Sequence, residues 1–460
     1  YDKAFVENRA VGFEQLGDEI INYPPEWAEK VCDIPAKTIV RITREIAASK
    51  PHVLIHRGYH GAVGAQYLNS FQTTRALAIA NALMGNINRK GGVYFSESAA
   101  LGELQQAHPV PPGPSGPKAD GTGIPGRYPL CSYGDGISHA IPELALRGIL
   151  KCGFVYHHNP LRTNPNPKRV IAGYKKLDLL VVIDPVLSET ASIAHYVLPA
   201  SFYLEADEAV DTKHSGKRAQ VSLQRKVIDP VFDTRSGFQI IGDLAKVLGV
   251  GRFFNFTLDE ANELRLKPLG ASLKNLKFKG ILPVGEPWKE GIKKLETPSG
   301  KVEIASSTLE NLGYPAIPRW EAPLVSPDDK DPHSFRLIHG KQAFHTHAMT
   351  ANQPYLMAIS RRYDLIRLWI NRGRAEKIGL KDGDLVQLKS LVGEGKIRVR
   401  LTEGLHPSCV WLPSGYWVFS KHLTTAYDQG LSYNDFLPTL FDPTVGHAMS
   451  SEVIVQVKKA

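Results

Sequence analysis

The 460-residue chain is long enough for roughly two to four domains, and its composition of 43% apolar and 22% charged residues is that of a globular protein. No apolar run approaches the ~20 residues that a membrane-spanning helix needs. The net charge of +9 would suit an anionic cofactor, an acidic partner or nucleic acid, or it serves solubility alone. Because the basic residues are scattered, with no basic tract interleaved with aromatics, we expect no nucleic-acid partner.

The cysteines give no cluster or metal motif. Cys32, Cys131, Cys152 and Cys409 show neither a CxxC pair nor zinc or iron–sulfur spacing, so we interpret them mostly as buried small hydrophobic residues. The chain also starts at Tyr1, without an initiator Met, which predicts a processed product or a fragment.

The first 90 residues are predicted to be mainly helical. Pro24-Pro25 starts one helix, a second follows over 36–48, and 52–56 (HVLIH) is predicted to be a short strand. A glycine-bearing loop then leads into a long helix over about 69–84. Its glycines would let the backbone approach a ligand, with Arg57 and His60 facing the same space; alternatively they only permit a tight turn.

The segment 153–201 is predicted to be a strand–loop–helix–strand unit. The five-residue run 179–183 (LLVVI) has no polar alternation, which indicates a strand covered on both faces in a parallel sheet. Ligands of such sheets bind at the carboxyl ends of strands. Asp184 would there accept hydrogen bonds from a ribose or base, and Arg162 would meet phosphate. The alternative is that Asp184 and Pro185 simply end the strand and that the Asn/Pro loop is only a turn.

The rest of the chain is predicted to be mixed and then all-β. The Pro- and Gly-rich stretch 99–133 is either a disordered linker or a functional surface loop. A strand over 221–225 and a helix over 238–248 follow, and 252–288 is expected to hold helices and loops. After a Pro-rich boundary at 315–332, short β-type runs indicate a barrel; they are 335–338, 385–390, 396–401, 410–412 and 453–457. The predicted fold class is therefore α/β, with Rossmann-like parallel-sheet domains and a C-terminal β-barrel-like domain.

Several segments taken together resemble a known family, and they occur in the same order along the chain as in that family. They are RGYHGAVGAQYLNSFQTTRALAIANALMGNINRKGG (57–92), HHNPLRTNPN (157–166), DPVLSETASIAHYVLPASFYLEADE (184–208), TPSGKVEI (297–304), HGKQAFHTHAMTANQPYL (339–356), NRGRAEKIGLKDGD (371–384) and SYNDFLPTLFDPTVG (432–446). They resemble the later part of a molybdopterin oxidoreductase of the dimethyl-sulfoxide-reductase type. The likeness is strongest to catalytic subunits of polysulfide or thiosulfate reductases, with tetrathionate and arsenate reductases as neighbours.

The resemblance implies a domain plan and a cofactor. Residues 1–140 would end an α/β domain that lines the active site, 141–250 would be half of a dinucleotide-binding domain, 251–332 a return segment and linker, and 333–460 a double-psi type barrel. It implies molybdenum or tungsten held by bis-molybdopterin guanine dinucleotide. The implied cofactor-binding residues are Asn159, Pro160, Arg162, Asp184, Ser188, Glu189, Thr190, His345, Thr346, His347, Asn352, Asn371 and Asn434.

The resemblance also implies partners, and some positions of the family have no matching residue in this chain. It implies a 4Fe-4S cluster in an N-terminal part that this sequence lacks, an iron–sulfur electron-transfer subunit, a membrane anchor subunit, a small inorganic anion as substrate and a periplasmic, membrane-associated location. No residue here matches the metal-ligand position, so the chain alone is expected to be inactive. Relatives of the sulfur type often place an Arg after Pro-Gly where this chain has 56–60 (HRGYH), so either Arg57 or His60 is expected to be the active-site cation.

Two other classes of protein are alternatives to such an enzyme. A non-catalytic scaffold or assembly subunit would also lack the cluster motif and metal ligand. A plain nucleotide-binding Rossmann enzyme would need GxGxxG, and the spacing of Gly58, Gly61 and Gly64 does not provide it.

Overall fold

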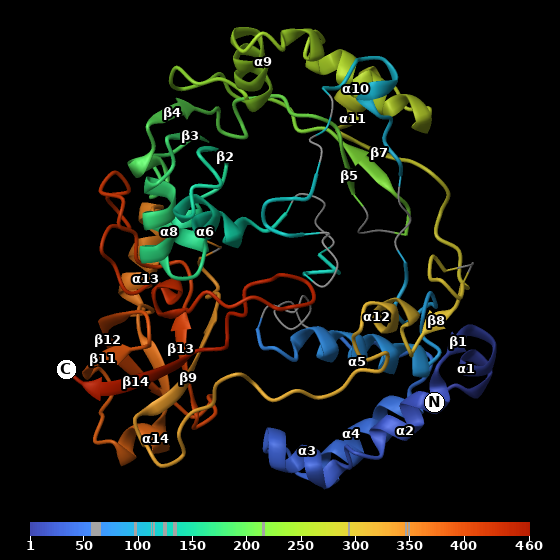
Figure 1. Cartoon of the computed structure of the whole chain (residues 1–460), viewed down its shortest axis with the longest axis vertical. Helices are drawn as coiled ribbons and strands as arrows, with labels where there is room; N and C mark the ends of the chain where they lie inside the picture. Colours follow the sequence, from blue (N-terminus) through green and yellow to red (C-terminus); the bar gives the residue numbers. More distant parts are fainter. Residues whose placement is uncertain are drawn as a thin grey trace.

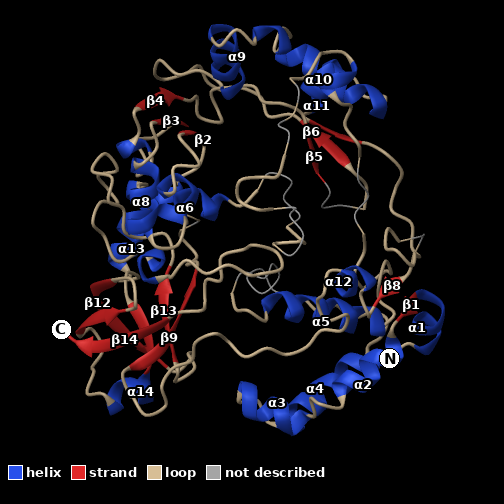
Figure 2. Cartoon of the chain, in the orientation of Figure 1, coloured by secondary structure: helices blue, strands red, loops and turns tan. Residues whose placement is uncertain are grey.

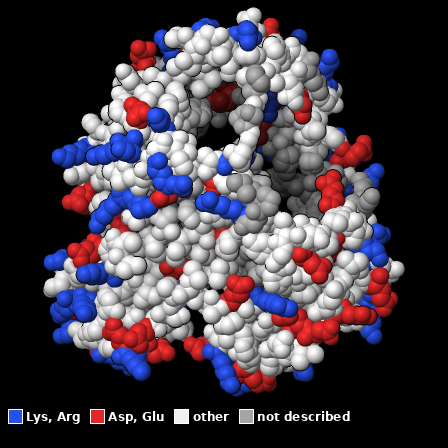
Figure 3. All heavy atoms as spheres, viewed as in Figure 1, with Lys and Arg blue, Asp and Glu red and all other residues white. Residues whose placement is uncertain are grey.

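The computed structural model describes residues 1–56, 66–95, 99–111, 113, 116–122, 127–131, 136–213, 217–292, 295–345, 347 and 350–460. Figure 1 shows the chain passing from the N-terminal helices to a parallel-sheet unit, on to a top arch of helices, and finally to a barrel that lies below the parallel-sheet unit. Within the described part of the chain, no helix combines the length and apolar character needed to cross a membrane. On the face seen in Figure 3, basic and acidic side chains are interspersed.

The N-terminal unit joins two distant parts of the chain. It holds α1 (Lys3–Arg9), β1 (Ala10–Val11), α2 (Phe13–Ile20), α3 (Pro25–Cys32), α4 (Ala36–Ala48), α5 (Ser70–Leu83), β8 (Val302–Glu303) and α12 (Ser307–Asn311). β1 and β8 pair in parallel, with Ala10 opposite Val302. The helices expected from Pro25, from Ala36 and over 69–84 are confirmed. The segment 290–332 therefore returns to the beginning of the chain.

The predicted strand at 52–56 is wrong, because asparagine side chains replace a neighbouring strand. Asn81 accepts a hydrogen bond from the Ile55 amide at 3.0 Å and donates one to the Ile55 carbonyl at 2.8 Å. Asn86 donates to the Val53 carbonyl. The backbone groups are thus satisfied without a ladder.

The interpretation of the cysteines as mostly buried is also wrong. Cys32 and Cys152 are exposed, and Cys131 and Cys409 are only half-buried. Cys32 lies at the end of α3, and none of the residues of α3 is buried. Cys152 begins the outer strand β2, where most side chains are at least partly exposed.

The parallel-sheet unit is built as predicted. It contains η2 (Ser138–Ala140), α6 (Ile141–Leu146), β2 (Cys152–Tyr156), α7 (Pro160–Thr163), α8 (Pro167–Lys175), β3 (Leu179–Asp184), η3 (Ala191–Ile193), β4 (Tyr196–Pro199) and α9 (Gly237–Val247). Its sheet has the order β2-β3-β4, entirely parallel, and β3 in the middle is almost wholly buried. Asn166 accepts from the Arg169 amide and Pro167 takes the first turn, so α8 begins where the sequence predicts.

The top arch is a small antiparallel sheet with helices beside it (Figure 2). It contains η1 (Leu104–Gln106), β5 (Asp211–Lys213), β6 (Gln220–Ser222), η4 (Gly251–Phe253), α10 (Leu258–Leu266), η5 (Lys267–Leu269), α11 (Leu273–Lys279) and β7 (Ile281–Pro283). The sheet order is β5-β6-β7. The expected strand at 221–225 is shorter than predicted, and β7 was not predicted.

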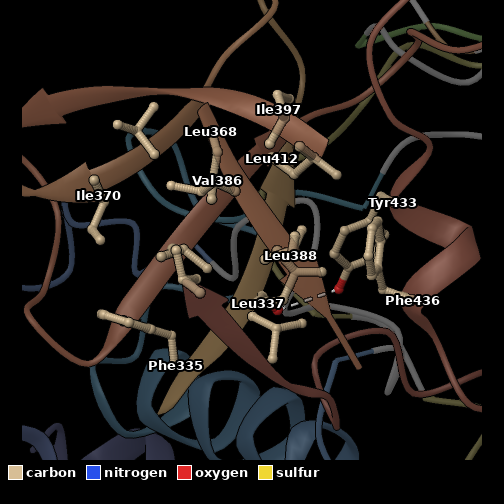
Figure 4. Close-up of a cluster of buried hydrophobic side chains, with 14 of the residues drawn as sticks. Phe335, Leu337, Leu368, Ile370, Val386, Leu388, Ile397, Leu412, Tyr433 and Phe436 are labelled. Atoms are coloured by element: carbon tan, nitrogen blue, oxygen red, sulfur yellow. Dashed lines mark hydrogen bonds between the residues drawn. The ribbon is translucent and has the colours of Figure 1, made fainter. Parts of the chain in front are cut away.

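The C-terminal region is a closed six-stranded barrel, which confirms the predicted barrel-like domain. Its members are β9 (Ser334–Gly340), α13 (Pro354–Arg362), β10 (Leu368–Asn371), α14 (Arg372–Lys377), β11 (Leu385–Lys389), β12 (Glu394–Thr402), β13 (Cys409–Pro413), η6 (Tyr433–Phe436) and β14 (Ile454–Lys459). The strand order is β10-β12-β11-β14-β9-β13, with parallel pairs β10/β12 and β9/β13. Inward side chains such as Phe335, Leu337, Leu368, Val386 and Leu412 fill its core (Figure 4).

Candidate functional site

The two polar loops that follow β2 and β3 meet at the end of the sheet. Asn159 donates from Nδ2 to Glu189 Oε2 at 2.7 Å, and its Oδ1 accepts from the Thr190 hydroxyl at 2.8 Å and from the Thr190 amide at 3.2 Å. Parallel strands bring their carboxyl ends to one edge, so the predicted proximity follows from the topology. Asn159 therefore ties the loops to each other.

Asp184 closes the turn that it begins. Its carboxylate accepts from the Val186 amide at 3.0 Å and from the Ser188 hydroxyl at 3.5 Å. Burial raises the pKa of Asp184, while these hydrogen bonds and the charge of His157 act in the opposite direction. Ser188 in turn accepts from the Ala191 amide at 3.4 Å. These contacts match the alternative interpretation of Asp184 as a strand-ending residue, and its contact with a ligand stays a prediction.

A cavity of about 380 Å³ lies between the parallel-sheet unit and the barrel; we call it the Arg162 cavity. It brings together three of the predicted residues, Arg162, His347 and Asn434. Its described lining contains no Asp or Glu; the lining residues are Gln66, His139, Arg162, Thr163, Pro165, His339, Lys341, His347, Ser414, Gly415, Tyr416, Ser432, Tyr433, Asn434, Leu437, Ala448 and Ser450.

Arg162 is a buried cation with an unused donor. One guanidinium nitrogen, Nη2, donates to the Tyr416 carbonyl, whereas the buried Nη1 has no hydrogen-bond partner among the described residues. Burial lowers the pKa of Arg162 to about 10, and the charges of Glu189 and Asp435 oppose this lowering. The side chain is therefore still charged at neutral pH. A buried cationic group with an unused hydrogen-bond donor favours binding of an anion.

The barrel is connected to Arg162 through η6. Asn434 donates from Nδ2 to the Arg162 carbonyl at 2.8 Å, and the Asn434 carbonyl accepts from the Asn166 amide at 3.0 Å. Burial raises the pKa of the neighbouring Asp435 to about 6, against the charges of Arg162 and Lys168. These contacts between η6 and the segment 162–166, which we call the seam, hold the loop after α7 against the barrel.

The loop that follows β9 separates two predicted histidines. His345 is buried outside the cavity lining, with Nδ1 3.2 Å from the Thr350 hydroxyl and Nε2 2.7 Å from the Ser360 hydroxyl. Burial lowers its pKa. His347 is exposed, has a φ of 51°, and lies with Nε2 3.4 Å from Lys341 Nζ. Opposite it, Gly415 has a φ of +98°, and a Cβ there would lie only 2.9 Å from the His347 carbonyl.

The remaining predicted residues do not line this cavity. Asn371 caps α14 by accepting from the Arg374 amide at 3.0 Å and donates to the Leu405 carbonyl at 2.9 Å. Asn352 accepts from the Thr425 amide at 3.1 Å. Pro160 is buried in the first turn of α7. Arg57, His60 and Thr346 lie outside the described residues.

Several lining residues were missed by sequence reasoning. His339 stacks on Tyr433, with ring centroids 4.0 Å apart, and its Nδ1 is 3.0 Å from the Ser414 hydroxyl. His339 lies near the end of β9, and Ser414 directly follows β13, its parallel neighbour. Ligands often bind at the ends of parallel strands, the argument used above for Asp184. The same argument would have indicated His339 and Ser414 if the pairing of β9 with β13 had been foreseen.

A larger groove of about 810 Å³ lies beside α9 and shares no residue with the predicted site. Its charged side chains largely pair with near neighbours. Asp243 lies 3.2 Å from Arg235 and 3.1 Å from Lys246, and Lys226 lies 2.6 Å from Asp229. It therefore leaves less uncompensated charge for a ligand than the smaller Arg162 cavity.

Comparisons with known proteins match two regions of the chain. Residues 46–247 match the family model described as molybdopterin oxidoreductase, and residues 335–454 match the molydopterin dinucleotide binding domain. The chain thus carries a molybdopterin oxidoreductase domain and a molydopterin dinucleotide binding domain over these two regions. The family resemblance and the fold class expected from the sequence are thereby confirmed.

The matches to curated relatives span most of this chain. It is 29% identical to the thiosulfate reductase molybdopterin-containing subunit of Salmonella typhimurium, over 97% of this chain and 63% of the relative. It is 29% identical to the F420-dependent formate dehydrogenase subunit alpha of Methanocaldococcus jannaschii, over 90% of this chain and 60% of the relative. It is 25% identical to a dimethyl sulfoxide/trimethylamine N-oxide reductase of Cereibacter sphaeroides, over 91% and 56%. The chain thus spans less than two thirds of each relative.

Among solved structures, the acetylene hydratase of Pelobacter acetylenicus superposes with a TM-score of 0.80 at 20% identity. The match covers all of this chain and 68% of that one. This likeness shows the fold alone.

Proposed function

We propose that this chain is part of the catalytic subunit of a molybdenum or tungsten bis-molybdopterin guanine dinucleotide oxidoreductase that reduces a sulfur compound such as polysulfide or thiosulfate. The observation that carries the proposal is the buried Arg162, with its unpartnered Nη1, in a cavity whose described lining has no carboxylate. The likeness to a thiosulfate reductase subunit supports the sulfur substrate.

The residues present fit the anionic part of such a dinucleotide. Arg162 Nη1 would donate to a phosphate oxygen, and Lys341, His339 and His347 would add cationic or neutral donors on the barrel side. Gly415 would let the backbone approach the ligand closely, since a side chain there would collide with the His347 carbonyl. When bound, the metal–pterin group supplies the redox chemistry, and these residues bind and orient it.

The roles of the complete subunit extend the proposal. We propose that it receives electrons through a 4Fe-4S cluster and an iron–sulfur partner subunit, that a membrane anchor subunit completes the complex, and that the complex is periplasmic. The cation that faces the anionic substrate would be Arg57 or His60. Tetrathionate or arsenate reduction, arsenite oxidation and a non-catalytic scaffold are the competing functions.

The cofactor is tested on the complete subunit by metal analysis and by the nucleotide released on denaturation. We expect molybdenum or tungsten together with GMP; a preparation with neither would contradict the proposal and favour a scaffold. A panel of polysulfide, thiosulfate, tetrathionate and arsenate, assayed with the same reduced dye, then decides the substrate. Turnover of arsenate with none of a sulfur compound would reject the sulfur assignment.

The anion site is tested on the 460-residue chain with inorganic pyrophosphate as the probe. Arg162→Met keeps much of the side-chain length but removes the charge and the donors. We expect calorimetric pyrophosphate binding to weaken by at least about tenfold, whereas Arg169→Met, which alters a half-exposed ion pair outside the cavity, leaves it unchanged. Equal weakening in both variants would show a non-specific charge effect and would reject the site.

A further inference from the structure

A group of buried polar side chains in the barrel region leads from His345 to Arg162. His345 follows β9, Ser360 lies in α13, and Tyr416 follows β13; all three are buried. Neither His345 nor Ser360 lines the Arg162 cavity. We call His345, Ser360, Tyr416 and their hydrogen-bond partners the His345 network. A residue that does not line the cavity can act on an anion there only through a residue that does.

The polar groups of the His345 network pair with one another. The two ring nitrogens of His345 lie 3.2 Å from the Thr350 hydroxyl and 2.7 Å from the Ser360 hydroxyl. The Ser360 hydroxyl also lies 2.9 Å from the Tyr416 hydroxyl, which donates to Gln342 Oε1 at 2.7 Å. A buried polar network whose members are all satisfied is rigid. These contacts therefore fix the position of Tyr416.

The ring of His345 adds packing to these hydrogen bonds without adding a charge. The His345 and Tyr416 rings meet edge to face, with centroids 4.9 Å apart and an interplanar angle of 72°. Burial lowers the pKa of His345, so the ring is neutral at pH 7. The other members carry hydroxyl or amide groups. The network thus has no charge with which to attract an anion directly.

The main chain of Tyr416 connects the network to Arg162. The Tyr416 carbonyl accepts a hydrogen bond from Arg162 Nη2, whereas the buried Nη1 has no hydrogen-bond partner among the described residues. Because the guanidinium is planar, the position of one terminal nitrogen sets the direction of the other. The Tyr416 carbonyl therefore sets where Nη1 points.

Glu189 is a competing partner for the Arg162 guanidinium. Its side chain is almost completely buried; Oε2 accepts from Asn159 at 2.7 Å, and Oε1 has no hydrogen-bond partner among the described residues. Burial lowers the pKa of Arg162 to about 10, and the charge of Glu189 opposes this, so the two side chains attract each other. An Arg162 released from the Tyr416 carbonyl would turn toward this carboxylate, which is a stronger acceptor. An incoming anion would then meet a neutralised cation.

We propose that the His345 network positions Arg162 for the anion. His345 and Ser360 hold the Tyr416 carbonyl on Arg162 Nη2, which keeps Nη1 free for the anion instead of pairing with Glu189. His345 and Ser360 are thus positioning residues that do not touch the ligand. This role rests on the proposed function for the identity of the anion.

Calorimetric binding of inorganic pyrophosphate to the 460-residue chain tests this role. Ser360→Ala removes the hydroxyl between His345 and Tyr416, and Tyr416→Phe removes the hydroxyl that it contacts. Each change should weaken pyrophosphate binding by about three- to tenfold. Ser390→Ala is the matched control, because Ser390 is also buried but its hydroxyl bonds within its own turn, at the Gly393 carbonyl. It should leave the affinity unchanged; an equal loss in Ser390→Ala and Ser360→Ala would overturn the proposal.

Double variants separate positioning from a general loosening of the fold. In the Arg162→Met background, Ser360→Ala should cause no further loss of pyrophosphate affinity, because its effect passes through the guanidinium. Glu189→Gln should raise the affinity of the Ser360→Ala variant more than it raises the affinity of the wild type, because it removes the competing charge. Equal gains in the two backgrounds would contradict the proposal, also where Arg162→Met binds too weakly to be measured.

A second measurement does not use the anion. Backbone hydrogen exchange over 160–164, which contains Arg162, should increase in Ser360→Ala and Tyr416→Phe but not in Ser390→Ala. If the wild-type chain does not bind pyrophosphate, the proposed anion site is wrong, and hydrogen exchange still decides whether the network holds Arg162. Unchanged exchange over 160–164 in both network variants would reject the positioning role. Thermal unfolding of each variant shows that it is folded, and Tyr416→Phe, which keeps the ring, serves if Ser360→Ala does not fold.

Discussion

The barrel and the parallel-sheet unit differ in how deeply their strands are buried, although both have apolar cores. The barrel closes on itself, and its strands bury a continuous apolar core. The three-stranded sheet has two outer strands, β2 and β4, with mostly exposed or half-buried side chains, and only β3 is deeply buried. Polar contacts at the strand ends connect its loops to each other and to the barrel. The candidate site therefore lies where a closed barrel meets a unit whose strand-end loops are joined by hydrogen bonds.

The largest expected effect concerns the barrel core. Phe335 is completely buried, so Phe335→Ala should lower the free energy of unfolding by about 3–5 kcal/mol. The matched change Phe154→Ala on β2, where the side chain is 51% exposed, should lower it by less than about 1 kcal/mol. Urea unfolding followed by tryptophan fluorescence measures both. Similar losses in the two variants would contradict the distinction between the barrel and the sheet.

The next effect is a pH dependence at the seam. Because burial raises the folded-state pKa of Asp435 to about 6, the protonated carboxyl stabilises the fold below the unfolded-state pKa. This contribution is lost as the pH rises from about 4 through 6. We expect the free energy of unfolding to fall by up to about 2–3 kcal/mol over this range. Urea unfolding across this range should show a shallower decline for Asp435→Asn than for the wild type. Parallel profiles would show that Asp435 does not titrate in this way.

Loss of the Asn159 contacts that join the two loops should have a smaller effect. Asn159→Ala removes the contacts with Glu189 and Thr190 and leaves their buried groups unpaired, so we expect a loss of about 1–3 kcal/mol. Hydrogen exchange should increase over 188–191 while the barrel strands remain protected. Asn22→Ala, which removes an exposed hydrogen bond to a nearby carbonyl, is the control. Uniform loss of protection would mean that the two units unfold together.

Local sequence patterns predicted much of this fold, whereas contacts between residues far apart in the sequence determine the structure of the candidate site. The uninterrupted run at 179–183 predicted β3, and Pro167 predicted the start of α8. The four-residue strand β10 was missed because it is too short for a clear periodicity. The burial of Arg162 could not be predicted, because its carbonyl partner at Tyr416 is 254 residues away.

The smallest effect separates a structural asparagine from a binding one. Asn371 was expected to contact the cofactor, but its side chain caps α14 and holds the Leu405 carbonyl. Asn371→Ala should therefore lower the free energy of unfolding by about 1 kcal/mol, as for other N-caps, and leave pyrophosphate affinity unchanged. Asn434→Ala removes the link to the Arg162 carbonyl beside the cavity, so it should weaken pyrophosphate binding as well as stability. If Asn371→Ala weakens pyrophosphate binding as much as Asn434→Ala does, the anion site extends beyond the Arg162 cavity to the far end of β10.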